Sequence, residues 1–96
     1  MIILMLFRIS GHSMLPMFKP GQILLVSSIP FLFRKPRVGD VVVVKDPQSE
    51  KPLLKRITKV EGEKYFVAGD NPDDSRDSRE FGLVSKDNLL GKLIMS

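Results

Sequence analysis

Residues 38–45 read Val-Gly-Asp-Val-Val-Val-Val-Lys, which is a turn signal followed by an unbroken β-branched run. Glycine and aspartate favour turns, and β-branched side chains favour strands, so this stretch predicts a turn that enters a strand. The same pattern recurs outward along the chain, where Gly, Pro and Asp separate short apolar runs. We expect strands at about residues 2–9, 22–27, 40–45, 53–60, 64–68 and 89–95.

The predicted fold class is mostly β, as a small coiled antiparallel sheet or partly open barrel, because no window carries a long 3.6-residue apolar repeat. Glu61-Gly62-Glu63 is expected to join two strands as a hairpin. Single helical turns are expected after Ser13 and near residues 85–88. Residues 28–38 and 69–82 are predicted to be long loops, which in compact domains are often functional.

Bulk composition narrows the class of protein. A chain of 96 residues is predicted to form one domain, residues 1–96. The absence of cysteine excludes disulfides and thiol nucleophiles, and a single histidine argues against a zinc site. The net charge of +4 is compatible with an anionic partner, but dispersed cations and few aromatics argue against nucleic acid.

The apolar start of the chain, residues 2–7, is much shorter than the roughly 20 residues of a membrane-spanning helix. It also lacks the basic start and the small-residue cleavage site of a secretory signal peptide. We interpret it as a buried strand, and we expect any membrane anchor to lie outside this sequence.

A serine nucleophile and a lysine base are the candidate catalytic pair. A serine hydroxyl such as that of Ser13 needs a base to take its proton. His12 is its neighbour, but adjacent side chains in extended backbone point to opposite faces, so we interpret His12 as an exposed loop residue. In an extended segment Lys55 shares a face with Leu53 and Ile57, and burial there would favour its uncharged amine. A solvated lysine at a sheet edge is the alternative.

The polar stretch at residues 69–79 has a competing interpretation as a calcium loop. If Asn71 is the first ligand, oxygen-bearing side chains follow at alternate positions. The sixth position is then Arg76 rather than glycine, and the twelfth is Gly82 rather than glutamate, so the EF-hand pattern fails. We predict no metal site, and interpret the stretch as a turn-rich loop in which Arg and Asp pair and which could orient a lysine.

Four stretches lie in order along nearly the whole chain: Ser13-Met14-Leu15-Pro16 after a glycine, Gly39-Asp40-Val41-Val42, Lys55-Arg56, and Gly69-Asp70-Asn71 with Ser75-x-Asp77-Ser78-Arg79. Together they resemble the motif boxes of type I signal peptidases, the serine/lysine endopeptidases that remove secretory signal peptides. The segment between Lys55 and Gly69 has no room for the extra β domain of larger members. In size the chain is similar to short members labelled maturation proteases for nickel-containing superoxide dismutase.

The resemblance implies that Ser13 is the nucleophile and Lys55 the general base. It also implies that Ser75 hydrogen-bonds the lysine amine, and that an Asp77–Arg79 ion pair supports the loop.

The resemblance further implies that the Ser13 backbone N–H contributes to an oxyanion hole. Some members carry a serine two residues before the nucleophile, and Gly11 occupies that position here. By the same matching, four residues are expected to line a shallow pocket for small substrate residues: Ile9, Met14, Phe18 and Leu54.

The predicted function is a serine endopeptidase that cleaves signal or leader peptides after small residues. Its substrate is expected to be an extended peptide that pairs with a strand edge, and no cofactor is expected. The alternatives are a cytosolic maturation protease that removes a pro-segment, a self-cleaving switch domain, and a non-catalytic peptide-binding module of the same fold.

A second predicted partner is a membrane surface. Phe31-Leu32-Phe33 followed by Arg34-Lys35 resembles an interfacial anchor, with aromatics at the acyl boundary and cations on the headgroups. The alternative is that the phenylalanines fold back onto the core. The expected location is the outer face of the cytoplasmic membrane, with a soluble cytoplasmic form as the alternative.

Overall fold

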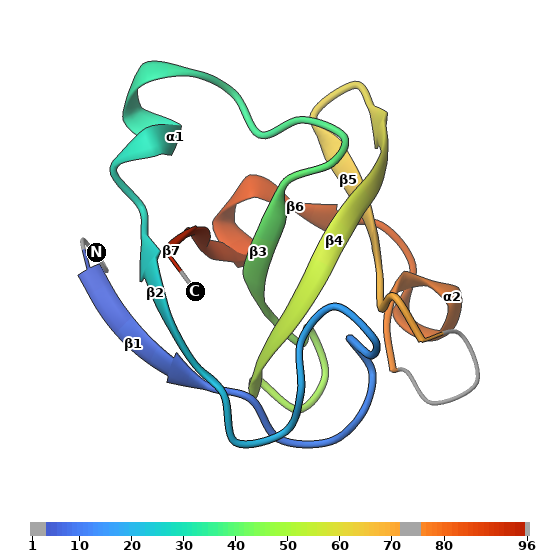
Figure 1. The fold of residues 1–96 in the computed structure, drawn as a ribbon. Coiled ribbons are helices and arrows are strands. Elements are labelled where there is room, and N and C mark those ends of the chain that lie inside the picture. The colour runs from blue at the N-terminus through green and yellow to red at the C-terminus, as the bar shows by residue number, and fades with distance from the viewer. Residues whose placement is uncertain (1–3, 72–75, 96) are drawn as a thin grey trace.

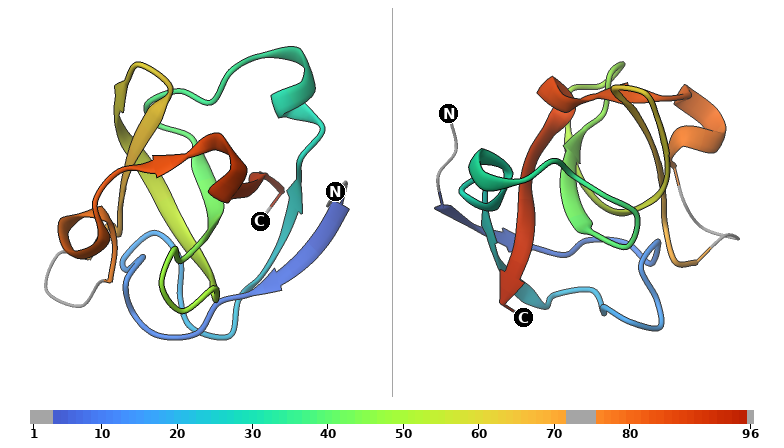
Figure 2. Two further views of the ribbon diagram at one scale, coloured as in Figure 1. Left: turned by 180° about the vertical axis from the view of Figure 1, so that it is seen from behind. Right: turned by 90° about the horizontal axis from the view of Figure 1, so that it is seen from above.

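One seven-stranded antiparallel sheet forms the body of the protein, with the spatial order β1-β2-β7-β3-β4-β5-β6. A computed structural model describes residues 4–71 and 76–95. The strands are β1 (Leu4–Arg8), β2 (Ile23–Ser27), β3 (Val41–Lys45), β4 (Pro52–Glu61), β5 (Lys64–Ala68), β6 (Val84–Ser85) and β7 (Leu89–Met95). The sheet curls into a half-barrel, which the view from above shows most clearly (Figures 1 and 2). The prediction of a mostly-β coiled sheet is confirmed.

The central strand β3 is buried on both of its faces. Alternate residues of a strand point to opposite faces, so its four valines divide between two apolar clusters. The first core contains Ile9, Met14, Phe18, Leu24, Val26, Val41, Val43 and Leu54. The second core contains Phe31, Val42, Val44, Ile57, Tyr65, Val67, Val84 and Leu89. A flat sheet of this size would leave one face of β3 in water, and the curl of the sheet prevents this.

Register shifts between paired strands accompany this curl. They occur at Leu25/Val26 between β2 and β7, at Val43/Val44 between β3 and β7, and at Ile57/Lys59 between β4 and β5. Such irregularities increase the local twist of a sheet. All of them involve the strands that surround the two cores.

The six expected strands correspond to β1, β2, β3, β4, β5 and β7; β5 and β7 have the expected ends, and the described ends of the others differ by one residue, with residues 2–3 outside the described residues. The interpretation of the first as a buried strand is wrong, because β1 is an edge strand whose Leu4 and Leu6 are exposed. Strand β6 was not predicted, because two residues carry no measurable alternation. The expected turn at residues 61–63 is present as the hairpin between β4 and β5.

The predicted loops contain two short helices, so the loop prediction is wrong over these residues. Helix α1 (Pro30–Phe33) begins with proline at its first turn, and α2 (Ser78–Phe81) begins after the capping side chain of Asp77. A 3-10 helix, η1 (Lys86–Asn88), confirms the turn expected near residues 85–88. After Ser13 the chain forms hydrogen-bonded turns, in one of which the Phe18 N–H donates to the Met14 carbonyl oxygen with the spacing of the single helical turn expected there.

The two ends of the half-barrel carry different segments. The long connection between β1 and β2, which contains Ser13, lies at one end, whereas α1 and the β4–β5 turn lie at the other (Figures 1 and 2). Within residues 4–71 and 76–95, no helix has the length and apolar character that a membrane span requires.

Gly91 provides a test of how closely the strands approach. A Cβ at this position would lie 2.7 Å from Val26 Cγ1 and 3.1 Å from the Ser27 carbonyl carbon and oxygen. We expect Gly91→Ala to lower the free energy of unfolding by about 1–3 kcal/mol, because the paired backbones must move apart. Urea denaturation measures this, with the exposed-strand variant Lys59→Ala as control; equal stability of both variants would contradict the close approach.

Candidate active site

Ser13 lies half-buried on the connection between β1 and β2. The neighbouring side chains Met14 and Phe18 are 1% and 6% exposed and belong to the first core. At the base of the connection, the Gly21 N–H donates to the Ile9 carbonyl oxygen at 2.7 Å, and the Ile9 N–H donates to Gln22 at 2.9 Å. The connection is therefore fixed by apolar packing in its middle and by backbone hydrogen bonds at its ends.

Gly11 has a φ of +78°, in the left-handed region that favours glycine. A serine at this position would strain the backbone, although its Cβ would have no atom within 4 Å beyond its immediate chain neighbours. This gives a conformational reason why the chain carries glycine where some type I signal peptidases carry serine.

Lys55 is buried within β4, at 2% exposure. It pairs with Val42 of β3, and it shares its strand face with Ile57, which is fully buried in the second core. The prediction that Lys55 lies on an apolar, inward face is confirmed. Burial in such surroundings disfavours a charged ammonium relative to a neutral amine.

Residues 69–71 form hydrogen bonds with both the segment that contains Ser13 and the segment that contains Lys55. The Asn71 N–H donates to the Ser13 carbonyl oxygen at 2.7 Å, and the Asn71 side-chain amide donates to the His12 carbonyl oxygen at 3.1 Å. Asp70 accepts two hydrogen bonds from the guanidinium of Arg56, at 3.0 and 2.9 Å. Since Arg56 follows Lys55 directly, this 69–71 junction holds the Ser13 connection beside the central part of β4.

Asp77 supports the junction from the other side. Its carboxylate is fully buried and accepts hydrogen bonds from the Gly69 N–H at 2.8 Å and from the Arg79 N–H at 3.0 Å. The guanidinium of Arg79 also donates to it, so the ion pair that the family resemblance implied is present. The next residue, Ser78, accepts a hydrogen bond from the Val67 N–H at 2.9 Å and so ties α2 to β5.

Ser75, which the resemblance placed against the lysine amine, lies outside the described residues. Its contact with Lys55 therefore stays a prediction, as do the catalytic functions of Ser13, Lys55, Asp77 and Arg79.

The four residues expected to line a substrate pocket do lie together, in the first core. Their exposed fractions are small: 5% for Ile9, 1% for Met14, 6% for Phe18 and 5% for Leu54. They could form the floor of a shallow site next to Ser13, and their contact with substrate stays a prediction.

An ion pair between Asp46 and Arg76 was not foreseen from the sequence. Asp46 follows β3, is 1% exposed, and accepts hydrogen bonds from the Arg76 guanidinium and from the N–H groups of Gln48 and Ser49. The Arg76 guanidinium holds the pKa of Asp46 well below its usual range, and the two N–H groups add to this against the opposing effect of burial. Asp46-Pro47 signals a turn, but no local pattern indicates a partner 30 positions away.

This pair predicts a pH-dependent contribution to stability. Because the pKa of Asp46 is lower in the folded than in the unfolded chain, its contribution is complete above the unfolded value of about 4 and is lost as the pH falls below it. We expect Asp46→Asn to lower the free energy of unfolding by about 2 kcal/mol at pH 7 and by progressively less below pH 4.

Denaturant titrations at pH 7, 4 and 3 measure this difference, with the exposed variant Glu63→Gln as the charge-matched control. A difference between Asp46→Asn and the parent that stays constant as the pH falls would contradict the assigned cause.

Comparisons with known proteins agree with this arrangement. The family described as signal peptidase, peptidase S26, matches residues 1–64 and 58–96. The chain is 32% identical over 108 residues to mitochondrial ATP-independent inner membrane protease subunit 1b of Arabidopsis thaliana, covering 88% of this chain and 64% of that protein. It is 40% identical over 63 residues to signal peptidase IB of Staphylococcus aureus, covering 62% of this chain and 31% of the relative.

A shorter match, 47% over 49 residues, links it to signal peptidase I of Buchnera aphidicola subsp. Schizaphis graminum (strain Sg), covering 51% of this chain and 16% of that protein. The chain thus spans at most about two thirds of the length of these relatives. With the family match extending over both the Ser13 and the Lys55 segments, the chain belongs to the type I signal peptidase family, peptidase S26.

Proposed function

We propose that this protein is a serine endopeptidase in which Ser13 is the nucleophile and Lys55 the general base. The observation that carries the proposal is the 69–71 junction, which hydrogen-bonds the Ser13 connection on one side and the residue after a buried Lys55 on the other. Family membership supports the same pair, because the family match extends over both segments.

The proposed reaction proceeds through an acyl-enzyme. The amine of Lys55 takes the proton of the Ser13 hydroxyl as its oxygen attacks the scissile carbonyl carbon. The resulting ammonium gives that proton to the leaving amine when the C–N bond breaks. The amine then takes a proton from water, whose oxygen attacks the ester, and the proton returns to Ser13 Oγ. The Ser13 backbone N–H would donate to the oxyanion.

The 69–71 junction and the buried Asp77 would hold this geometry. Arg79 neutralises the charge of Asp77, so that the carboxylate can accept the Gly69 N–H within a buried site. The positions of the two catalytic side chains must be fixed, because a displacement of about 1 Å can lower the catalytic rate by about a hundredfold.

We propose that the substrate is an extended signal or leader peptide cut after small residues. The relatives are named signal peptidases and an inner membrane protease, and the four residues that the resemblance assigns to a pocket for small residues lie together in the first core. The alternative substrate is the pro-segment of one specific protein, which a maturation protease would remove.

The dyad predicts that Ser13→Ala and Lys55→Met each lower kcat/KM by at least about a thousandfold. Methionine keeps most of the buried volume of Lys55 without an amine, so its effect reports on proton transfer rather than on a cavity. The assay is cleavage of a peptide with alanine at the first and third positions before the cut. Activity of the parent should rise with pH, because Lys55 must lose its proton before it can act as a base.

The matched controls are Ser10→Ala and Lys51→Met, two exposed residues of the same types. A serine-directed acylating probe should label the parent and Ser10→Ala but not Ser13→Ala. Full turnover by Lys55→Met would refute the mechanism. A folded parent that neither cleaves peptides nor takes up the probe would indicate a non-catalytic peptide-binding module.

We also propose that the tip formed by Leu32 and Phe33 contacts a membrane surface, and that this surface is the outer face of the cytoplasmic membrane. These two side chains are 64% and 84% exposed, whereas Phe31 is 7% exposed and belongs to the second core. The alternative that phenylalanines fold onto the core is thus correct for Phe31 and wrong for Phe33. Arg34 forms two hydrogen bonds of 3.0 Å with Asp40, which leaves Lys35 as the headgroup cation of the predicted anchor.

The membrane contact predicts that Leu32→Ser/Phe33→Ser abolishes co-sedimentation with vesicles that contain anionic phospholipid. Met17→Ser/Leu83→Ser removes exposed apolar side chains elsewhere and should leave co-sedimentation unchanged. Equal binding by both double variants, or no binding by the parent, would refute the contact. Phe31 is left intact because its removal would open the second core.

A further inference from the structure

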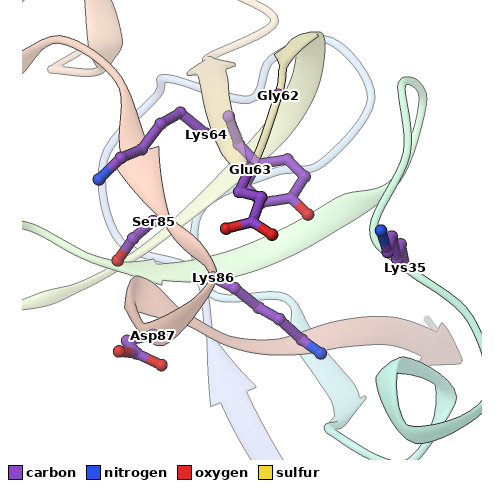
Figure 3. Close-up of a pocket in the computed structure, with 8 residues that line it drawn as sticks. Lys35, Gly62, Glu63, Lys64, Ser85, Lys86 and Asp87 are labelled. Atoms are coloured by element: carbon purple, nitrogen blue, oxygen red, sulfur yellow. The ribbon is translucent and has the colours of Figure 1, made fainter.

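A cavity of about 410 Å³ is lined in part by the β4–β5 turn. That turn lies at the end of the half-barrel opposite the Ser13 connection (Figure 1). Three separate segments line it: Lys35 after α1, residues 62–65 at the β4–β5 turn, and residues 85–87 at β6 and η1 (Figure 3). Its volume is within the range of small-molecule sites. Lys55 and the β4–β5 turn are separated by six residues of one extended strand, about 20 Å, so the cavity is distinct from the proposed active site.

The side chains that line the cavity carry a small net positive charge. Three lysines line it, Lys35, Lys64 and Lys86, against two carboxylates, those of Glu63 and Asp87. Among residues 4–71 and 76–95, none of these lysines forms an ion pair. In Figure 3 the ammonium ends of Lys35 and Lys86 extend to the same side of the cavity, and Lys64 extends to the other.

Tyr65 adds a hydroxyl donor to this lining. Its side chain is only 4% exposed because the ring packs in the second core, yet the residue lines the cavity. Its hydroxyl forms no hydrogen bond with any other residue in the described part of the chain. A donor fixed by a buried ring, in a lining that also contains lysines, is suited to an anion that accepts several hydrogen bonds.

We propose that this cavity binds a phosphate ester, with the phosphate group held by Lys35, Lys86 and the Tyr65 hydroxyl. A phosphate monoester carries close to two negative charges and three terminal acceptor oxygens, and the phosphodiester of a phospholipid carries one charge and two such oxygens, so either can accept from two ammonium groups and a hydroxyl. The ester could belong to a phospholipid headgroup, since Lys35 follows the exposed tip at Leu32 and Phe33, or to a soluble metabolite. The inference uses neither Ser13 nor Lys55.

Titration with inorganic phosphate, followed by two-dimensional amide NMR, tests the site itself. We expect saturable shifts at residues 62–65 and 85–87, and none with sodium chloride at the same ionic strength. Lys35→Gln/Lys86→Gln should weaken binding by about fivefold for each lysine, and Tyr65→Phe should weaken it without loss of stability. Lys51→Gln/Lys59→Gln, with the same change in charge on exposed residues elsewhere, should bind phosphate as the parent does.

A second arm distinguishes the two sources of the ester. If a headgroup is bound, Lys86→Gln and Tyr65→Phe, which leave Lys35 and the Leu32–Phe33 tip intact, lose affinity for vesicles of phosphatidylglycerol in phosphatidylcholine and the control double variant does not. If a soluble ester is bound, the variants lose phosphate shifts but bind these vesicles like the parent. Shifts that do not saturate, or losses shared equally by the cavity and control variants, overturn the proposal. Labelling of Ser13 by the acylating probe reports separately on the peptidase.

Discussion

The burial of β3 on both faces is the constraint on which the rest of the structure depends. Four consecutive valines require apolar partners above and below the strand, so the sheet must curl far enough to supply a core on each side. Lys55 is buried because it pairs with one of these valines, Val42, on the face of the second core. Met14 is buried because it packs in the first core. The two proposed catalytic segments are thus fixed from opposite faces of the same sheet.

The 69–71 junction links these two faces through three consecutive residues. Gly69 donates to a buried carboxylate, Asp70 accepts from Arg56, and Asn71 donates to the Ser13 carbonyl oxygen. The three partners, Asp77, Arg56 and Ser13, lie in three different segments of the chain. A hydrogen bond between peptide groups is worth about 1 kcal/mol, and one to a charged group about 1.5–3 kcal/mol. Together these bonds determine the relative position of the segments, which is what a two-residue catalytic pair requires.

The features that could be predicted have a pattern within a few consecutive residues, and those that could not depend on contacts between distant parts of the chain or on elements too short to show a pattern. The valine run predicted β3 because β-branched side chains favour strands. The apolar neighbours of Lys55 predicted its burial because alternate residues of a strand share a face. Helices α1 and α2 have four residues each, which is too short for a helical period to be seen. The Asp46–Arg76 pair joins distant turns and has no local signature. Phe31 and Phe33 are chemically identical, and only the path of α1 decides that one is buried and the other exposed.

Two groups of cationic side chains lie in different environments. Arg34, Arg56, Arg76 and Arg79 are each engaged by an aspartate, where the planar guanidinium can form two bonds at once. Lys35, Lys64 and Lys86 instead present their ammonium groups to solvent around one cavity. Acetylation of these lysines would therefore alter the outer electrostatic potential while leaving the internal arginine–aspartate pairs intact. The four arginines thus connect segments of the fold through aspartates, whereas the three lysines leave their charges at the surface of the cavity.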